Sequence, residues 1–229
     1  MRTTSIVILA IVLFASTSCL TSQDIIAAVN FARVNPHTIR DRLYAKYGNM
    51  PGPTHDPTCY TDAISFTNSQ APLKPLYENA GLDLAAWKQS RYIVLKLGKI
   101  DHIGEGGSTT KDRILAVGTW MGCWGYGENI GQILRPDAIY PSADEFVMMW
   151  IMDCGVPDRG HRISIYDPRF MFQGCGVFQG PMKENGKTLT GTLVTCDFTR
   201  AYRMLPSVYP QLAEAGLSIE KNAKGFTGV

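Results

Sequence analysis

The chain of 229 residues lacks the short motifs that most directly assign an enzymatic activity. It has no His-Glu-x-x-His zinc-protease motif and no Gly-x-Ser-x-Gly nucleophile motif. It also has no Cys-x-x-Cys pair, which argues against a redox dithiol and against a structural zinc ribbon. Because no Asn-x-Ser/Thr sequence occurs, N-glycosylation is not expected.

An excess of charge of one sign is also lacking. The formal net charge is +2, which gives no electrostatic case for binding to nucleic acid or to an anionic membrane surface. Hydrophobic residues make up 45% of the chain, enough for a sizeable core. Internal repeats, heptads and low-complexity tracts are absent, so the sequence predicts one domain.

Long hydrophobic runs are missing, and the most apolar stretch, from Ile6 to Ala15, is too short to span a bilayer. Arg2 precedes this stretch and small residues follow it, which is the layout of a secretory signal peptide. We therefore expect a signal peptide over residues 1–19, cleaved between residues 19 and 22, and an extracellular protein without a transmembrane segment. A buried N-terminal helix is the alternative for the same stretch.

Secretion changes what the cysteines mean, because disulfides persist outside the cell. Five of the six cysteines remain if Cys19 leaves with the signal peptide, so one thiol should stay unpaired. Near the end of the domain, Asn185-Gly186 is a strong two-residue hairpin signal between apparent strands at residues 172–179 and 188–198. In that register Cys175 lies opposite Cys196, which makes them a candidate cross-strand disulfide.

Helical periodicity marks several segments. Residues 49–77 carry five prolines and form an irregular excursion, which is either functional or disordered. Residues 201–229 show little periodicity and are predicted to be a C-terminal tail. The helices are expected at residues 24–34, 38–47, 82–97 and 142–153, with shorter ones near 60–67 and 110–116.

One stretch carries most of the chemical information. A capping box, Ser142-x-x-Glu145, begins a helix whose apolar stripe continues to Asp153. A buried carboxylate needs a cation, a metal or hydrogen-bond donors, because an unpaired one is very costly. A turn rich in glycine and proline follows and presents His161. An acid and an imidazole this close predict one wall of a polar site.

Two other segments complete that site in our interpretation. Of the four histidines, His37 and His55 lie in turn-like settings typical of surface loops. His102 and His161 instead lie in glycine-flanked turns at the ends of helices. Glu128 lies in a segment rich in glycine and aromatic residues.

These segments, in this order, resemble the CAP superfamily of cysteine-rich secretory, venom-allergen-like and pathogenesis-related proteins, whose domain is also called SCP. The resemblance covers residues 22–200 and looks most like the branch found in microbes and protists. It implies an α+β fold, an α–β–α sandwich with a small antiparallel sheet between helical layers. The segments that carry it are Leu82-x-Leu-Ala-Ala, His102-Ile-Gly, Gly127-Glu128-Asn129-Ile130, Gly160-His161-Arg162 and Gly174-x-Gly176-Val177.

The resemblance also implies a cleft lined by two histidines and two acids, which here are His102, His161, Glu128 and Asp153. The last position is usually a glutamate, so the shorter Asp153 alters the reach of the fourth group. Two imidazoles and a carboxylate suit a divalent ion such as Zn²⁺, with His102, His161 and Glu128 as ligands. Two alternatives stay open: a metal-free cleft in which each imidazole bonds a carboxylate, and a purely structural network.

Binding roles are chiefly what the resemblance implies, with sterols, other lipids, metal ions and partner proteins as ligands. We therefore expect a secreted binding protein for a small lipid, a sterol or a protein partner, and we assign no catalytic residue. The alternative is a metal-dependent extracellular hydrolase of the protease type. A structural or defence protein with a vestigial cleft is the third hypothesis.

The same cleft would bring Cys123 close to Cys154, so the predicted disulfides are Cys123–Cys154 and Cys175–Cys196, with Cys59 unpaired. The aromatic side chains of Trp120, Trp124 and Tyr126 are expected to fill the core. Arg159 and Arg162 flank His161 and are expected to stabilise the turn or to be solvated, rather than to bind an anion.

Overall fold

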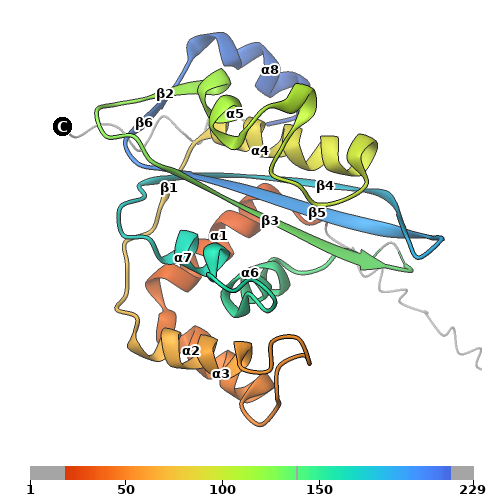
Figure 1. The fold of residues 1–229 in the computed structure, drawn as a ribbon. Coiled ribbons are helices and arrows are strands. Elements are labelled where there is room, and N and C mark those ends of the chain that lie inside the picture. Colours follow the sequence, from red (N-terminus) through yellow and green to blue (C-terminus); the bar gives the residue numbers. More distant parts are fainter. Residues whose placement is uncertain (1–18, 138, 218–229) are drawn as a thin grey trace, which may run out of the picture.

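A computed structural model describes residues 19–137 and 139–217. The predicted signal peptide, apart from Cys19, lies outside the described residues, as does the last part of the predicted tail. The fold is an α+β sandwich in which a four-stranded sheet lies between two helical layers (Figure 1). The predicted fold class is therefore confirmed. None of the described helices is long and apolar enough to cross a bilayer.

The strands of the main sheet are ordered β1-β4-β5-β3. The three long strands pair antiparallel, and the two-residue β1 pairs parallel with β4, so the sheet is mixed rather than wholly antiparallel. A second sheet of two short strands joins β2 to β6. The strands are β1 (Tyr77–Glu78), β2 (Gly118–Trp120), β3 (Tyr126–Arg135), β4 (Phe172–Glu184), β5 (Lys187–Thr199) and β6 (Tyr202–Met204).

The β4–β5 hairpin forms at the predicted turn. Asn185 and Gly186 have φ values of 50° and 76°, the left-handed conformation that a tight two-residue hairpin turn needs. The register places Cys175 opposite Cys196, and the predicted disulfide between them is present. Both strands extend farther toward the turn than residues 172–179 and 188–198.

One helical layer consists of α4 (Ala80–Tyr92), α5 (Thr110–Val117) and α8 (Tyr209–Glu214). Helix α4 continues as a π-helical turn, η1 (Ile93–Leu97), which ends at Gly98 as predicted. The helix packs directly on β4, because a Cβ atom at Gly176 would lie 2.0 Å from the backbone nitrogen of Trp87.

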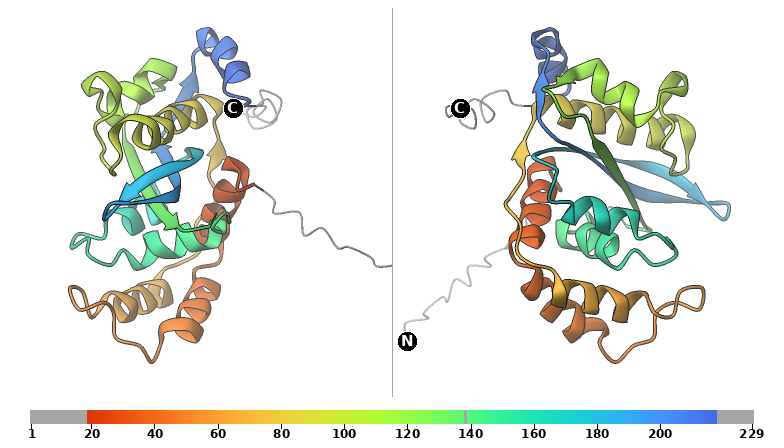
Figure 2. Two further views of the ribbon diagram at one scale, coloured as in Figure 1. Left: turned by 90° about the vertical axis from the view of Figure 1, so that its right-hand side faces the viewer. Right: turned by 60° about the vertical axis from the view of Figure 1, so that its left-hand side comes forward.

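The other layer is thicker. Helices α1, α6 and α7 cover the sheet, and Figures 1 and 2 show α2 and α3 beyond them, on the side away from the sheet. Asn35 ends α1, and Pro36 occupies the first turn of α2. The largest core cluster lies between α1, α6 and the sheet, with Phe146, Trp150 and Phe198 buried in it. The bounds are α1 (Ser22–Val34), α2 (Pro36–Tyr47), α3 (Cys59–Ser69), α6 (Ala143–Met152) and α7 (Gly160–Tyr166).

Two sequence-based predictions fail here. Residues 201–217 are not a loose tail, because β6 pairs with β2, and Val208 and Leu212 are buried in a cluster with residues of α4. Elements of three and six residues are too short to show periodicity. In the aromatic segment, Trp124 is 69% exposed and Tyr126 is 39% exposed, so neither fills the core.

Candidate functional site

Asp153 lies at the C-terminal end of α6 rather than on the helix itself. It caps the helix in the left-handed conformation, with a φ of 52° and a ψ of 40°. Its buried carboxylate accepts two hydrogen bonds from His161, one from the backbone nitrogen at 2.9 Å and one from Nδ1 at 2.6 Å. The predicted acid–imidazole pair is therefore formed, and one carboxylate holds both the backbone and the ring of His161.

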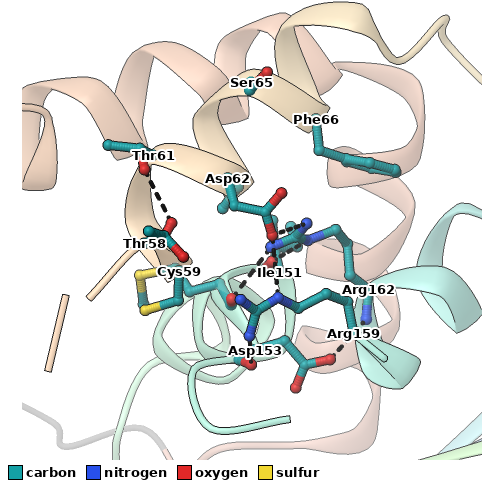
Figure 3. A network of polar contacts seen from close by, with 12 residues as sticks. Thr58, Cys59, Thr61, Asp62, Ser65, Phe66, Ile151, Asp153, Arg159 and Arg162 are labelled. Carbon is teal, nitrogen blue, oxygen red and sulfur yellow. Dashed lines mark hydrogen bonds and ion pairs between the residues drawn. The ribbon is translucent and has the colours of Figure 1, made fainter. Parts of the chain in front are cut away.

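The turn between α6 and α7 is stabilised by Arg159. Its guanidinium donates to the backbone oxygens of Asp153 at 2.8 Å and Val156 at 3.2 Å, and its Nε pairs with Asp62 at 3.0 Å (Figure 3). Hydrogen bonds from Arg159 lower the pKa of Asp56 to about 2. The hydrogen bonds of the Arg159 side chain thus hold the α6–α7 turn in place.

Arg162 completes the network from the first turns of α7. Its buried guanidinium pairs with Asp62 at 3.0 Å and lies 5.2 Å from the centre of the Phe66 ring (Figure 3). It also donates to the backbone oxygens of Ile151 and Met152. Both arginines stabilise the turn, as expected, and together they attach it to α3.

A disulfide also joins α3 to this turn, and here the sequence-based pairing is wrong. Cys154 is bonded to Cys59, with a Cα–Cα distance of 5.2 Å, whereas Cys123 is a free and exposed cysteine. The proline-rich segment folds back onto the turn, where Asp56 accepts a hydrogen bond from the backbone nitrogen of Gly155 at 3.0 Å. This long-range docking brings Cys59, the first residue of α3, to Cys154.

The second acid–imidazole pair is His102 with Glu128. His102, in the loop after η1, places Nδ1 2.7 Å from the carboxylate of Glu128 on β3. Thr110 donates to the same carboxylate at 2.8 Å, and Arg113 forms an ion pair with it. The side chain of Glu128 is 2% exposed and that of His102 is 57% exposed. The buried carboxylate of Glu128, which also contacts Thr110 and Arg113, thus holds an imidazole that is largely exposed to solvent.

The electrostatics of this pair follow from its hydrogen bonds. Burial alone would raise the pKa of Glu128, but the hydrogen bond with His102 and the charge of Arg113 outweigh it and lower that pKa. The bond to Glu128 raises the pKa of His102 against the opposing effect of burial. Both shifts favour the charged pair.

The two pairs lie on opposite faces of β3. Successive residues of a strand point to opposite faces. Glu128 faces the loop of His102 and α5, whereas the side chain of Asn129 donates to the backbone oxygen of His161 at 3.0 Å. Among the described residues, no group of three or more histidines, cysteines and acids could hold a metal ion. The side chains of His102, His161 and Glu128 therefore do not converge as a ligand set in this geometry, and each imidazole contacts a carboxylate instead.

A groove of about 370 Å³ runs beside β3 from the loop before His102 to the α6–α7 turn. His161 and Asp153 line it, whereas His102 and Glu128 do not. The predicted four-residue cleft is thus divided, with one acid–imidazole pair in the groove wall and the other outside it. The apolar side chains of the wall are Pro53, Tyr60, Ile100, Ile130, Met149, Trp150, Met152 and Val156.

A second hollow, of about 630 Å³, lies between α1 and residues 140–144. It is larger, but the described residues of its wall include no histidine. The smaller groove is the better candidate site, because its apolar wall contains an ordered acid–imidazole pair.

Asp197 is a buried polar residue beside the His102–Glu128 pair that sequence reasoning missed. It lies on β5 directly opposite Glu128 and is fully buried, and no described residue donates a hydrogen bond to its carboxylate. Burial and the charge of Glu128 raise its pKa well above the usual range. The sequence shows a single acid in the apolar stretch that ends β5, between Cys196 and Phe198, but the neighbour that makes it matter lies on β3.

Comparison with known proteins gives matches at the level of structure only. No family model matches the sequence, and no curated protein matches it. An extracellular protein containing an SCP domain from Bacillus anthracis str. Ames is 17% identical, with a TM-score of 0.39 over 62% of this chain and 38% of that one. BmVAL-1 is 14% identical, with a TM-score of 0.42 over 79% of this chain and 76% of that one.

The chain is similar in structure to SCP-domain proteins. Na-ASP-1 is another such match, 12% identical with a TM-score of 0.35 over 75% of this chain. The chain spans 38% of the length of Na-ASP-1, as it does of the Bacillus anthracis protein. Similarity at this level concerns the fold alone.

Proposed function

We propose that this protein is an extracellular binding module of the CAP type, and that its ligand occupies the groove beside β3. One observation carries the proposal: the His161–Asp153 pair stands in the wall of an otherwise largely apolar groove of about 370 Å³. Ligand sites in proteins are mostly apolar, with a few placed polar groups that fix orientation. The ligand should therefore offer apolar surface to most of the wall and carry a polar group that meets His161.

The side chains of the groove suit binding. Met149 and Met152 are flexible and polarisable, so they adapt to a ligand's shape. The volume lies at the small end of the usual range of roughly 300–1,000 Å³ for ligand sites. It fits a small lipid, a sterol, or a short segment of a larger partner.

The groove is also held in place before any ligand arrives. Cys59–Cys154 and the ion pairs of Arg159 attach the segment carrying Pro53 and Tyr60 to the α6–α7 turn. A wall fixed in advance loses less entropy on binding. The two disulfides also support an extracellular location, since disulfides persist in oxidising compartments.

The alternative of a metal-dependent hydrolase lacks comparable support. The described residues do not provide a ligand set for the metal that would activate water. The pairing of His161 with Asp153 resembles a base held by an orienting acid. However, the one cysteine in the groove wall, Cys154, is bonded in a disulfide and is not a nucleophile. Binding is therefore the function that the site supports best.

The test uses two isoleucines of one loop. Ile100 is 45% exposed and lines the groove, whereas Ile103 is 47% exposed and does not. Fluorescent fatty acid, cholesterol and random-sequence peptides serve as probes. Ile100→Glu should weaken binding at least about tenfold, which corresponds to roughly 1.4 kcal/mol, and Ile103→Glu should leave binding unchanged.

Two results would contradict the proposal. Equal binding by both variants would place the ligand outside the groove. Turnover of ester or peptide substrates that His161→Gln abolishes would favour the hydrolase.

A further inference from the structure

We propose that the occupant of the groove is an extended peptide segment that adds to the open edge of β3 as a further strand. This inference depends on the proposed function and names its partner class. The strand order β1-β4-β5-β3 leaves β3 at the edge, with β5 as its one neighbour among the described strands (Figure 1).

The groove reaches this edge at Ile130, Gly131 and Gln132. In an antiparallel pair, every second residue directs both its N–H and its C=O away from the neighbouring strand. Among three consecutive residues, at least one therefore points both groups away from β5. On the side away from β5, no backbone or side-chain group of the described residues forms a hydrogen bond with the main chain of residues 130–132. The groove thus contains a donor and an acceptor of the main chain that need partners.

The open edge of β3 is also regular enough to pair with a further strand. β3 pairs with β5 over ten consecutive positions, from Tyr126 to Arg135, without a bulge. It contains no proline and no lysine, two of the residues with which proteins usually block an exposed edge. An incoming strand would meet regular hydrogen-bonding geometry.

Side chains beside the edge could accept those of a bound strand. Alternate residues of an added strand point to the same face, and pockets for them give specificity. Met149, Met152 and Val156 supply apolar contacts on the side of the α6–α7 turn, and His161 with Asp153 supplies a polar one. The groove thus combines main-chain pairing with both kinds of side-chain contact.

A buried donor favours a peptide over a lipid. Trp150 is 1% exposed and lines the groove, and its indole Nε1 has no acceptor among the described residues. A Cβ atom on Gly131 would lie 3.1 Å from that nitrogen, so the unmet donor lies against the α6-side face of β3, at a residue where the groove reaches the edge strand. A peptide brings donors and acceptors along its whole length, whereas a sterol or a fatty acid brings one polar end.

The experiment begins with a phage library of random heptapeptides, panned against the disulfide-bonded protein. Selected peptides are synthesised with single N-methyl groups at each position. Methylation of alternate residues should weaken binding at least about tenfold, and methylation of the intervening residues should not. Hydrogen exchange should slow at amides within residues 130–132 when the peptide binds. Ile100→Glu should weaken peptide binding, and Ile103→Glu should serve as the matched control.

The outcomes separate this inference from the proposed function. If fatty acid or cholesterol binds in an Ile100-dependent way and no peptide is enriched, the groove is a binding site but the peptide inference is wrong. It is also wrong if selected peptides tolerate every N-methyl group, or if a second copy of the chain pairs with β3. If no probe binding depends on Ile100, both proposals fail.

Discussion

Glu128 and Asp197 are direct cross-strand neighbours, and both carboxyl side chains are buried. Glu128 has His102, Thr110 and Arg113 as partners, whereas Asp197 has no described donor. A buried acid beside a charged carboxylate is an unfavourable contact, because burial and the like charge both oppose ionisation of Asp197.

Replacing Asp197 should therefore stabilise the protein at high pH. Burial and Glu128 raise the pKa of Asp197 in the folded chain above its unfolded value. Such a group costs stability as the pH rises through the folded pKa, because the unfolded chain ionises more easily. We expect Asp197→Asn to raise the free energy of unfolding at pH 8 by on the order of 1 kcal/mol or more. Urea denaturation at pH 5 and pH 8 measures this, and an equal loss at both values would refute the assignment.

Asp153 holds His161 through both the backbone and the ring. Asp153→Ala leaves two donors without an acceptor, and we expect it to cost about 1–3 kcal/mol. Alanine also tolerates the positive φ of this position poorly. Asp153→Asn is the matched control, because asparagine adopts this conformation and keeps an acceptor oxygen. Denaturant unfolding of both variants makes the comparison, and equal stabilities would contradict the role given to the carboxylate.

The disulfide assignment predicts that replacing different cysteines changes the free energy of unfolding by different amounts. Replacing Cys59 and Cys154 together by alanine should lower the free energy of unfolding by about 2–5 kcal/mol, because the bridge closes a long loop. Cys123→Ser should leave stability unchanged, since Cys123 is exposed and unpaired. Non-reducing peptide mapping tests the pairing directly. Recovery of a Cys123–Cys154 peptide would restore the pairing expected from sequence.

Acid should weaken the attachment of the proline-rich segment. The pKa of Asp56 is lowered to about 2 in the folded protein, against an ordinary value of about 3.9. A lowered pKa contributes stability that is present above the unfolded value and is lost as the pH falls through the folded one. Between pH 4 and pH 2, the wild type should therefore lose stability more steeply than Asp56→Asn. Parallel curves for the two proteins over that interval would show that the ion pair with Arg159 contributes nothing.

Local signals in the sequence predicted much of the fold. The Asn185-Gly186 turn set the hairpin register and with it the Cys175–Cys196 bridge. Capping and glycine signals placed α6 and the end of the helical segment at Gly98. These features depend on neighbouring residues, which is why a single sequence reveals them.

Long-range packing was the part that sequence could not provide. The motifs indicated four residues that form two acid–imidazole pairs in the structure. The alternation of Glu128 and Asn129 along β3 separates the pairs, and only His161 and Asp153 line the groove. The partner of Cys154 was missed because the docking of residues 49–58 leaves no periodic signal. Asp197 was missed because its importance depends on a neighbour in another strand.

The Cys59–Cys154 bridge encloses α4, α5 and the whole of β3 in one covalent ring, since its ends lie 95 residues apart. A protease that cuts the backbone once inside this ring cannot separate the two pieces. A nicked molecule would migrate as two fragments only after reduction, and until then it would keep the β3 edge and the His161 wall joined. In an environment rich in proteases, this topology protects the groove against single cuts.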